Sequence, residues 1–221
     1  EYTQKDGTTS LSLKLYPGES VFIVFTRTKR NIAAANNNLN VKANVKTIEG
    51  PWKLTFPQGW GAPGEAVFDN LISWTDSEID GIKYFSGTAT YHKSFSVKQS
   101  EIDSSREIII DLGEICDLAE VYINNKSAGI LWKKPYVLNI KDFLKAGNNE
   151  LRIEVVNQWV NRLTGDMLSN PADRFCRTNQ PYITKDDAGF DNWAEGGDET
   201  FRLKDSGLLG PVNIIYVRGQ E

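Results

Sequence analysis

Apolar residues in this chain recur at every second position over many short stretches, and this alternation limits its possible folds more than any other feature. Ile108, Ile110 and Leu112 share one face of a predicted strand, and Val121 and Ile123 share a face of another. Such a period places one side of a strand against a core and the other side in solvent. Stretches with helical periodicity are almost absent. Many short strands with few helices are typical of a β-sandwich or barrel.

The same alternation predicts which side chains face the core. In a predicted strand over residues 91–97, Tyr91, Lys93 and Phe95 lie on one face and His92 lies on the other. Further strands are predicted at residues 41–48, 52–56, 151–155 and 212–217, and a tight hairpin turn is predicted at Asn124 and Asn125.

The first forty residues differ from the rest of the chain. Residues 11–15 alternate, and residues 21–25 are apolar on both faces, which predicts a hairpin whose second strand is covered twice. Residues 31–40 are rich in Ala and Asn and lack periodicity, as connections do. We therefore predict an N-terminal hairpin and linker at 1–40, which either ends a preceding β-domain or adds strands to the sandwich, and a main domain at 41–221.

Length and charge exclude several classes of function. The 221 residues are enough to bury a core without metals or disulfides. Lys and Arg number 25 against 29 Asp and Glu, so the net charge is −4, and this balance argues against a nucleic-acid surface. The longest apolar runs are far too short to cross a bilayer, so we expect no membrane partner.

Neither the cysteines nor the histidine predicts a catalytic or metal centre. Cys116 and Cys176 are 60 residues apart (176 − 116) without metal-ligand spacing around either, so they either form a disulfide or are buried as separate thiols. His92 is the only histidine, and a zinc site or a triad would need partners that the chain lacks. Its position in a strand predicts an ordinary strand-face side chain.

Several motifs in a fixed order resemble the sugar-binding jelly roll of glycoside hydrolase family 2. This resemblance rests on residues 84–91, 108–113, 119–129, 147–151 and 206–212. The chain is also similar to the C-terminal jelly roll of the α-L-rhamnosidase-like family 106 of gut and soil bacteria, through residues 81–91, 131–136, 161–166 and 206–212. The resemblance covers roughly residues 46–221, and the ordered set is more specific than any one motif.

The resemblance implies an all-β, antiparallel, galactose-binding-domain-like jelly-roll β-sandwich with long loops and little helix. It implies an accessory module of a bacterial glycoside hydrolase, exported to the periplasm or beyond, whose partners are a plant or host glycan and the parent's catalytic domain. A glycosidase needs two carboxylates about 5–9.5 Å apart, which these families carry on a (β/α)₈ barrel of about 250 residues. This chain contains no such pattern, so we expect no catalytic residue in it.

Sugar-binding sites combine aromatic rings with planar polar groups, and three segments supply both. Residues 131–136 offer rings that form either a sugar platform or an interdomain packing surface. Residues 157–162 form either a binding site or a self-satisfied network in which Arg162 pairs with Asp166. Residues 191–202 resemble a loop lent to an active site, and the alternative is a solvated acidic loop. The predicted substrate-binding residues are Trp132, Tyr136, Trp159, Asn161, Arg162, Trp193, Asp198 and Glu199.

Three hypotheses for function follow, in order. The first is a module that shapes a substrate cleft or buttresses a partner domain, the second an autonomous carbohydrate-binding module, and the third a complete small hydrolase using carboxylates of the 161–206 loop. No cofactor or metal is expected. A structural calcium ion is conceivable among the Asp, Glu and Gly residues of 191–202, but no EF-hand spacing supports it.

Overall fold

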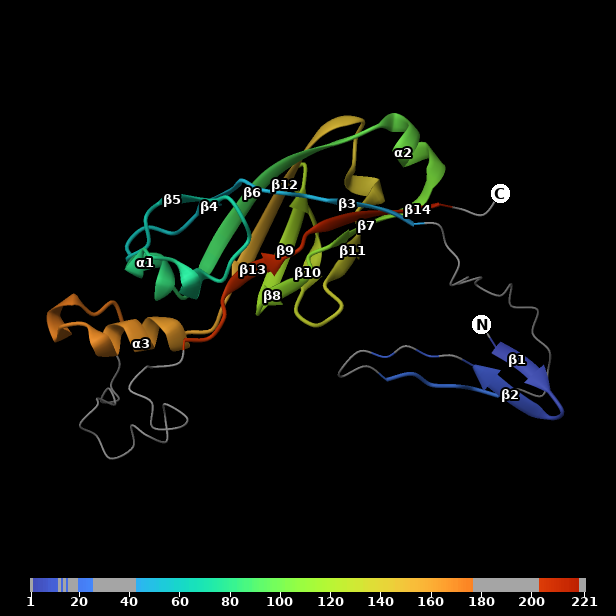
Figure 1. Cartoon of the computed structure of the whole chain (residues 1–221), viewed down its shortest axis with the longest axis horizontal. Coiled ribbons are helices and arrows are strands. Elements are labelled where there is room, and N and C mark those ends of the chain that lie inside the picture. The colour runs from blue at the N-terminus through green and yellow to red at the C-terminus, as the bar shows by residue number, and fades with distance from the viewer. Residues whose placement is uncertain are drawn as a thin grey trace.

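The chain folds into two antiparallel β-sheets that pack face to face (Figure 1), so the predicted β-sandwich is confirmed. The computed structural model describes residues 2–11, 13, 15, 20–25, 43–176 and 203–218. The six-stranded sheet has the order β10 (Lys126–Leu131), β9 (Leu118–Ile123), β12 (Gly147–Val156), β6 (Thr88–Val97), β4 (Trp52–Thr55) and β5 (Glu65–Phe68). The four-stranded sheet has the order β11 (Val137–Asn139), β7 (Ser105–Asp111), β14 (Asn213–Arg218) and β3 (Ala43–Thr47). A short pair, β13 (Gly207–Gly210) with β8 (Glu114–Cys116), lies beside them.

The core lies between the inward faces of the two sheets, as the alternation predicts. Tyr91 and Ile153 are buried from the six-stranded sheet, and Ile108, Ile110 and Ile214 are buried from the other. Each strand therefore leaves its alternate residues on the outer face of its sheet. Along β6 and β12, which are paired over their whole length, the outer face is half-buried at Thr90, His92, Arg152 and Glu154.

The turn between β9 and β10 confirms the prediction for Asn124 and Asn125. Both residues have positive φ, 50° and 63°, which Asn tolerates better than most residues and which a tight hairpin requires. Asn124 Nδ2 donates to Phe143 O at 2.9 Å and to Asn149 Oδ1 at 2.8 Å, so the turn is tied to its neighbours.

Short helices connect the strands. They are η1 (Trp74–Asp76), α1 (Asp80–Lys83), α2 (Gln99–Ser104), η2 (Lys141–Phe143), α3 (Val160–Leu168) and η3 (Pro171–Asp173). The predicted loop at 161–206 needs correction, because this segment opens with α3. Within the described parts of the chain, none of these helices is long and apolar enough to span a membrane.

The N-terminal hairpin lies earlier in the sequence than predicted. Strands β1 (Tyr2–Lys5) and β2 (Thr8–Leu11) pair with each other around Asp6 and Gly7, whose φ values of 49° and 73° suit a tight turn. Residues 21–25 form no strand, so the predicted strand there is wrong. Phe22 is 92% exposed, and a strand that is apolar on both faces needs covering layers, which it lacks here. The division at residue 40 stays a prediction.

Candidate functional site

A groove of about 580 Å³ opens at one end of the six-stranded sheet. The ends of β4 and β12 and the beginning of β6 form its floor, and the loop after β4 and the turn after β12 form its walls. Its lining consists of Thr55, Phe56, Pro57, Trp60, Ser86, Gly87, Thr88, Thr90, Glu154 and Trp159.

Two tryptophans give the groove an aromatic wall. The rings of Trp60 and Trp159 meet edge to face, with centroids 5.4 Å apart and planes at 62°. Trp159 is 51% exposed, whereas Trp60 packs partly against the core. The sequence predicted Trp159 but missed Trp60, whose only signal is a large ring in a Gly-rich loop. The pair offers an apolar surface beside the polar floor of the groove.

Buried side chains hold the turn that carries Trp159. Asn157 Nδ2 donates to Phe85 O and to Ser206 Oγ, each at 2.9 Å, and its Oδ1 accepts from Gly87 N at 2.9 Å. Ser86 Oγ donates to Gln158 O at 2.8 Å. These bonds tie the turn to the beginning of β6, so the groove is preorganised rather than dependent on loop ordering.

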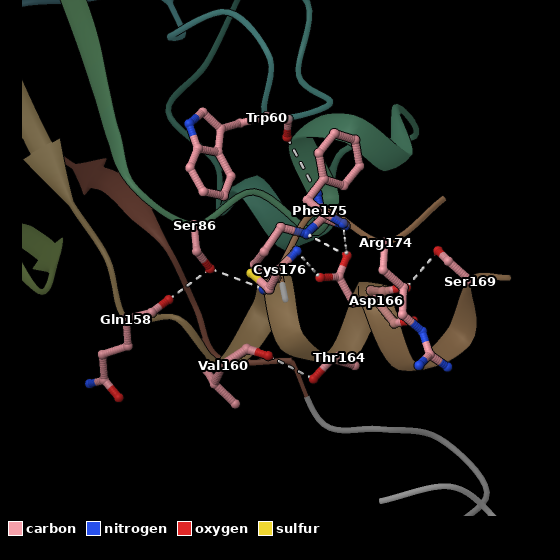
Figure 2. A network of polar contacts seen from close by, with 12 residues as sticks. Trp60, Ser86, Gln158, Val160, Thr164, Asp166, Ser169, Arg174, Phe175 and Cys176 are labelled. Carbon is pink, nitrogen blue, oxygen red and sulfur yellow. Dashed lines mark hydrogen bonds and ion pairs between the residues drawn. The ribbon is translucent and has the colours of Figure 1, made fainter. Parts of the chain in front are cut away.

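Helix α3 adds a second buried network (Figure 2). Asp166 is fully buried, and its carboxylate accepts from Phe175 N at 3.1 Å and from Cys176 N at 2.7 Å. Arg162 Nε forms an ion pair with Asp166 Oδ1 at 3.4 Å. Arg162 Nη1 donates to Trp60 O at 3.4 Å, so this network also supports the aromatic wall.

The structure therefore contains the pairing of Arg162 with Asp166 that one interpretation of the sequence predicted. Asn161 is also buried, and its amide bonds both Lys204 O and Lys204 N, at 2.7 and 2.8 Å. Both side chains therefore bind backbone groups of other segments: Asn161 binds the segment at Lys204, and Arg162 binds the loop at Trp60. Direct contact of Asn161 or Arg162 with a substrate stays a prediction.

The remaining predicted residues lie elsewhere. Trp132 is 68% exposed after β10 and lies outside the groove. Tyr136 is partly buried against the core, and burial raises the pKa of its hydroxyl. Trp193, Asp198 and Glu199 lie outside the described residues. Among the predicted residues that the structure describes, Trp159 alone lines the groove.

The two cysteines form no disulfide with each other. Burial, followed by the nearby charge of Asp117, raises the pKa of the Cys116 thiol, and burial raises that of Cys176. Both thiols are therefore protonated and weakly nucleophilic near neutral pH. Of the residues described, no group of three or more His, Cys, Asp and Glu is placed to hold a metal ion.

The groove can bind a flat ligand that has an apolar side and many hydroxyl groups. Trp159 offers a ring face, Thr55, Thr88 and Thr90 can donate and accept, and the Glu154 carboxylate accepts. Arg152 forms an ion pair with this carboxylate. These groups suit recognition of the hydroxyls of a ligand.

Comparison with known proteins gives similar parts of much longer chains. The chain is 35% identical over 214 residues to a provisionally named beta-glucuronidase of Formosa agariphila, covering 90% of this chain but 18% of that protein. The structure of a rhamnosidase from Novosphingobium sp. matches with a TM-score of 0.65 and 33% identity, over 79% of this chain and 15% of the rhamnosidase. No protein-family model matches.

A third protein shares the fold at lower identity. The β-D-glucuronidase of Dictyoglomus thermophilum matches with a TM-score of 0.54 and 20% identity, over 80% of this chain and 28% of that one. This chain thus spans less than a third of the length of each of these proteins. In sequence and fold, it is a β-sandwich similar to a domain-sized part of larger bacterial glycoside hydrolases.

Proposed function

We propose that this chain is a non-catalytic carbohydrate-contacting module of an exported bacterial glycoside hydrolase of the rhamnosidase-like type. The module places the groove of Trp60 and Trp159 where it contributes to the parent's substrate cleft. The parent's catalytic domain supplies the two carboxylates that glycoside hydrolysis requires. Its site of action is the periplasm or the cell exterior, in the breakdown of plant or host polysaccharide.

The observation that carries this proposal is the preorganised aromatic groove. Trp159 is 51% exposed, and the buried hydrogen bonds of Asn157 and Ser86 fix the turn that carries it. An exposed ring on a rigid support binds a ligand with little loss of conformational entropy. Similarity to part of two longer proteins, named as a glucuronidase and a rhamnosidase, supports a sugar as that ligand.

Titration calorimetry of the 221-residue chain tests the proposal. The panel contains rhamnose, galactose, glucuronate, and neutral and pectic oligosaccharides. We expect saturable binding to one or more of them, and Trp159→Ala weakens it about fivefold or more, because stacking on one exposed ring is worth roughly 1 kcal/mol or more. Trp132→Ala is the matched control, since it removes an even more exposed ring that lies outside the groove.

A second role rests on a different surface. Trp132 and Ile130 are 68% and 56% exposed on neighbouring positions of β10 and the loop after it, and together they suit packing against another domain. In that role the module is a buttress. If this is its role, the folded chain should bind no sugar of the panel. Trp132→Ala should then lower the thermal stability of the whole parent hydrolase.

A further inference from the structure

The outer face of the six-stranded sheet carries a second groove in line with the first. This groove has a volume of about 610 Å³, and its lining consists of Pro51, Lys53, Val67, His92, Lys93, Ser94, Asn125, Glu150, Leu151 and Arg152. It involves β4, β6 and β12, the same strands that form the floor of the Trp60–Trp159 groove.

The two grooves meet at successive outward positions of these strands. On β6, Thr88 and Thr90 line the first groove, and His92 and Ser94 line the second. On β12, Glu154 lies in the first and Arg152 in the second. Six residues of antiparallel strand span about 20 Å, so the path from Thr88 to Ser94 is long enough for several linked rings.

Cross-strand register arranges donors and acceptors in two adjacent rows along this path. One row places Lys53, His92 and Arg152 side by side, and the next row places Thr55, Thr90 and Glu154 side by side. Glu65, Glu120 and Tyr122 extend the rows on the outer strands. A ligand that lies across both rows therefore meets the donors of the first row and the acceptors of the second.

Ion pairs link several of these side chains. Lys53 Nζ lies 2.6 Å from Glu65 Oε1, and Arg152 pairs with Glu154 across the two rows. The Arg152 guanidinium also stacks on the Tyr122 ring, with 3.6 Å from its central carbon to the ring centroid. A planar guanidinium fixed in this way can present its remaining N–H groups to neighbouring hydroxyls.

The charges of the path favour a neutral ligand over an anionic one. Among the lining residues, Lys53, Lys93 and Arg152 face Glu150 and Glu154, and Glu65 and Glu120 lie beside the grooves on the flanking strands, so the charges nearly cancel. Burial, followed by the charge of Lys53, lowers the pKa of His92, so its imidazole is neutral near pH 7. A carboxylated sugar chain would lose the hydration of its charges without a net attraction in return, so a neutral chain is favoured.

We infer that the two grooves form one extended subsite path along β6, and that it binds an unbranched neutral oligosaccharide. This inference rests on the proposed function, because the Trp60–Trp159 groove supplies one end of the path. It adds a second end, in which Lys53, His92 and Arg152 bind the hydroxyls of further sugar units.

The test compares short and long ligands on the whole 221-residue chain by titration calorimetry. The probes are disaccharides and hexasaccharides of the neutral cello-, xylo- and galacto-oligosaccharide series, and a galacturonate hexasaccharide. We expect a neutral hexasaccharide to bind at least about tenfold more tightly than its disaccharide. Arg152→Gln should remove most of this gain, since any effect through the Arg152–Glu154 ion pair weakens both probes alike and their affinity ratio reports on the second groove.

Arg106→Gln on β7 is the matched control, because Arg106 also pairs with a neighbouring glutamate but lies on the other sheet. Thermal melting of each variant verifies that the fold is intact. The inference is overturned if neutral hexasaccharide and disaccharide bind equally, if Arg152→Gln acts like Arg106→Gln, or if the galacturonate chain binds most tightly. In each of these cases Trp159→Ala still reports separately on the proposed function.

Discussion

His92 is the only histidine of the chain, so one imidazole signal reports on the environment of the second groove. Burial lowers its pKa first, and the positive charges of Lys53 and Arg152 lower it further. Its Nε2 also lies 3.1 Å from Thr55 Oγ1. The ring is therefore held in its neutral form within the row of donors.

We expect the NMR titration midpoint of His92 to lie below the ordinary value of about 6.5. Lys53→Met should raise this midpoint, because it removes a nearby cation and leaves the Glu65 carboxylate, which raises the pKa of His92. Lys126→Met on β10 is the control and should leave it unchanged. An unchanged midpoint in Lys53→Met would show that Lys53 does not act on the imidazole.

The sign of the pH effect on stability follows from the same shift. The folded pKa lies below the unfolded value, so as pH falls the unfolded chain takes up the proton first. The contribution of neutral His92 to stability is thus fully present above about pH 6.5 and is lost as the pH falls through the folded pKa. His92→Gln should remove this part of the pH dependence in urea unfolding.

At the scale of elements, α3 explains both what the sequence could predict and what it could not. The strands were predictable because their buried residues are apolar and alternate, as with Tyr91 and Phe95 on β6. Helix α3 was not, because its buried residues include Asn161, Arg162 and Asp166. Apolar periodicity cannot reveal a helix whose buried face is polar and satisfied by distant segments.

The residues of the groove were predictable only in part, because its aromatic wall joins residues that are far apart in the sequence. Trp159 stood out as a ring among polar residues at a strand end, whereas its contact with Trp60 joins residues 99 positions apart (159 − 60). Neither alternation nor a turn signal encodes such a contact. It arises because the loop after β4 and the turn after β12 meet at the same end of the sheet.

Replacement of Asn161 tests whether α3 holds the segment before β13 in place. Its amide makes three hydrogen bonds to the segment before β13, two to Lys204 and one to Ser206 Oγ at 2.8 Å. Asn161→Ala should lower the free energy of unfolding by about 2 kcal/mol, because it removes three hydrogen bonds of a buried amide. Amide hydrogen exchange at Lys204 should accelerate, while Ser206 N keeps its bond to Ser73 Oγ at 3.1 Å.

Asn170→Ala is the control for this measurement. Asn170 is exposed and bonds only weakly, at 3.4 Å, to Asp173, so its replacement should change stability by no more than about 0.5 kcal/mol. If Asn161→Ala has an equally small effect and leaves the Lys204 amide protected, then α3 does not hold this segment in place.

For the whole molecule, the core and the N-terminal region differ in how far their apolar residues are buried. The buried core cluster draws its residues from Ile48 onward, and the two sheets enclose it. Strands β1 and β2 pair with each other in a sheet of their own. Residues 21–25 contribute no strand, and Phe22, Val24 and Phe25 are 92%, 77% and 74% exposed. Such an exposed apolar run favours association between chains.

Deletion of residues 1–40 therefore tests the predicted domain division and the source of any self-association together. The shortened chain should unfold in one cooperative transition with a Tm within about 3 °C of the full chain, since a loss below about 1 kcal/mol shifts Tm by only 2–4 °C at this size. Sedimentation should show concentration-dependent association of the full chain that the deletion abolishes. A Phe22→Ser, Phe25→Ser variant of the full chain should behave like the deletion, because the exposed rings cause the association. Loss of the transition on deletion would instead place residues 1–40 within the folding unit of the sandwich, and the division near residue 40 would then be wrong.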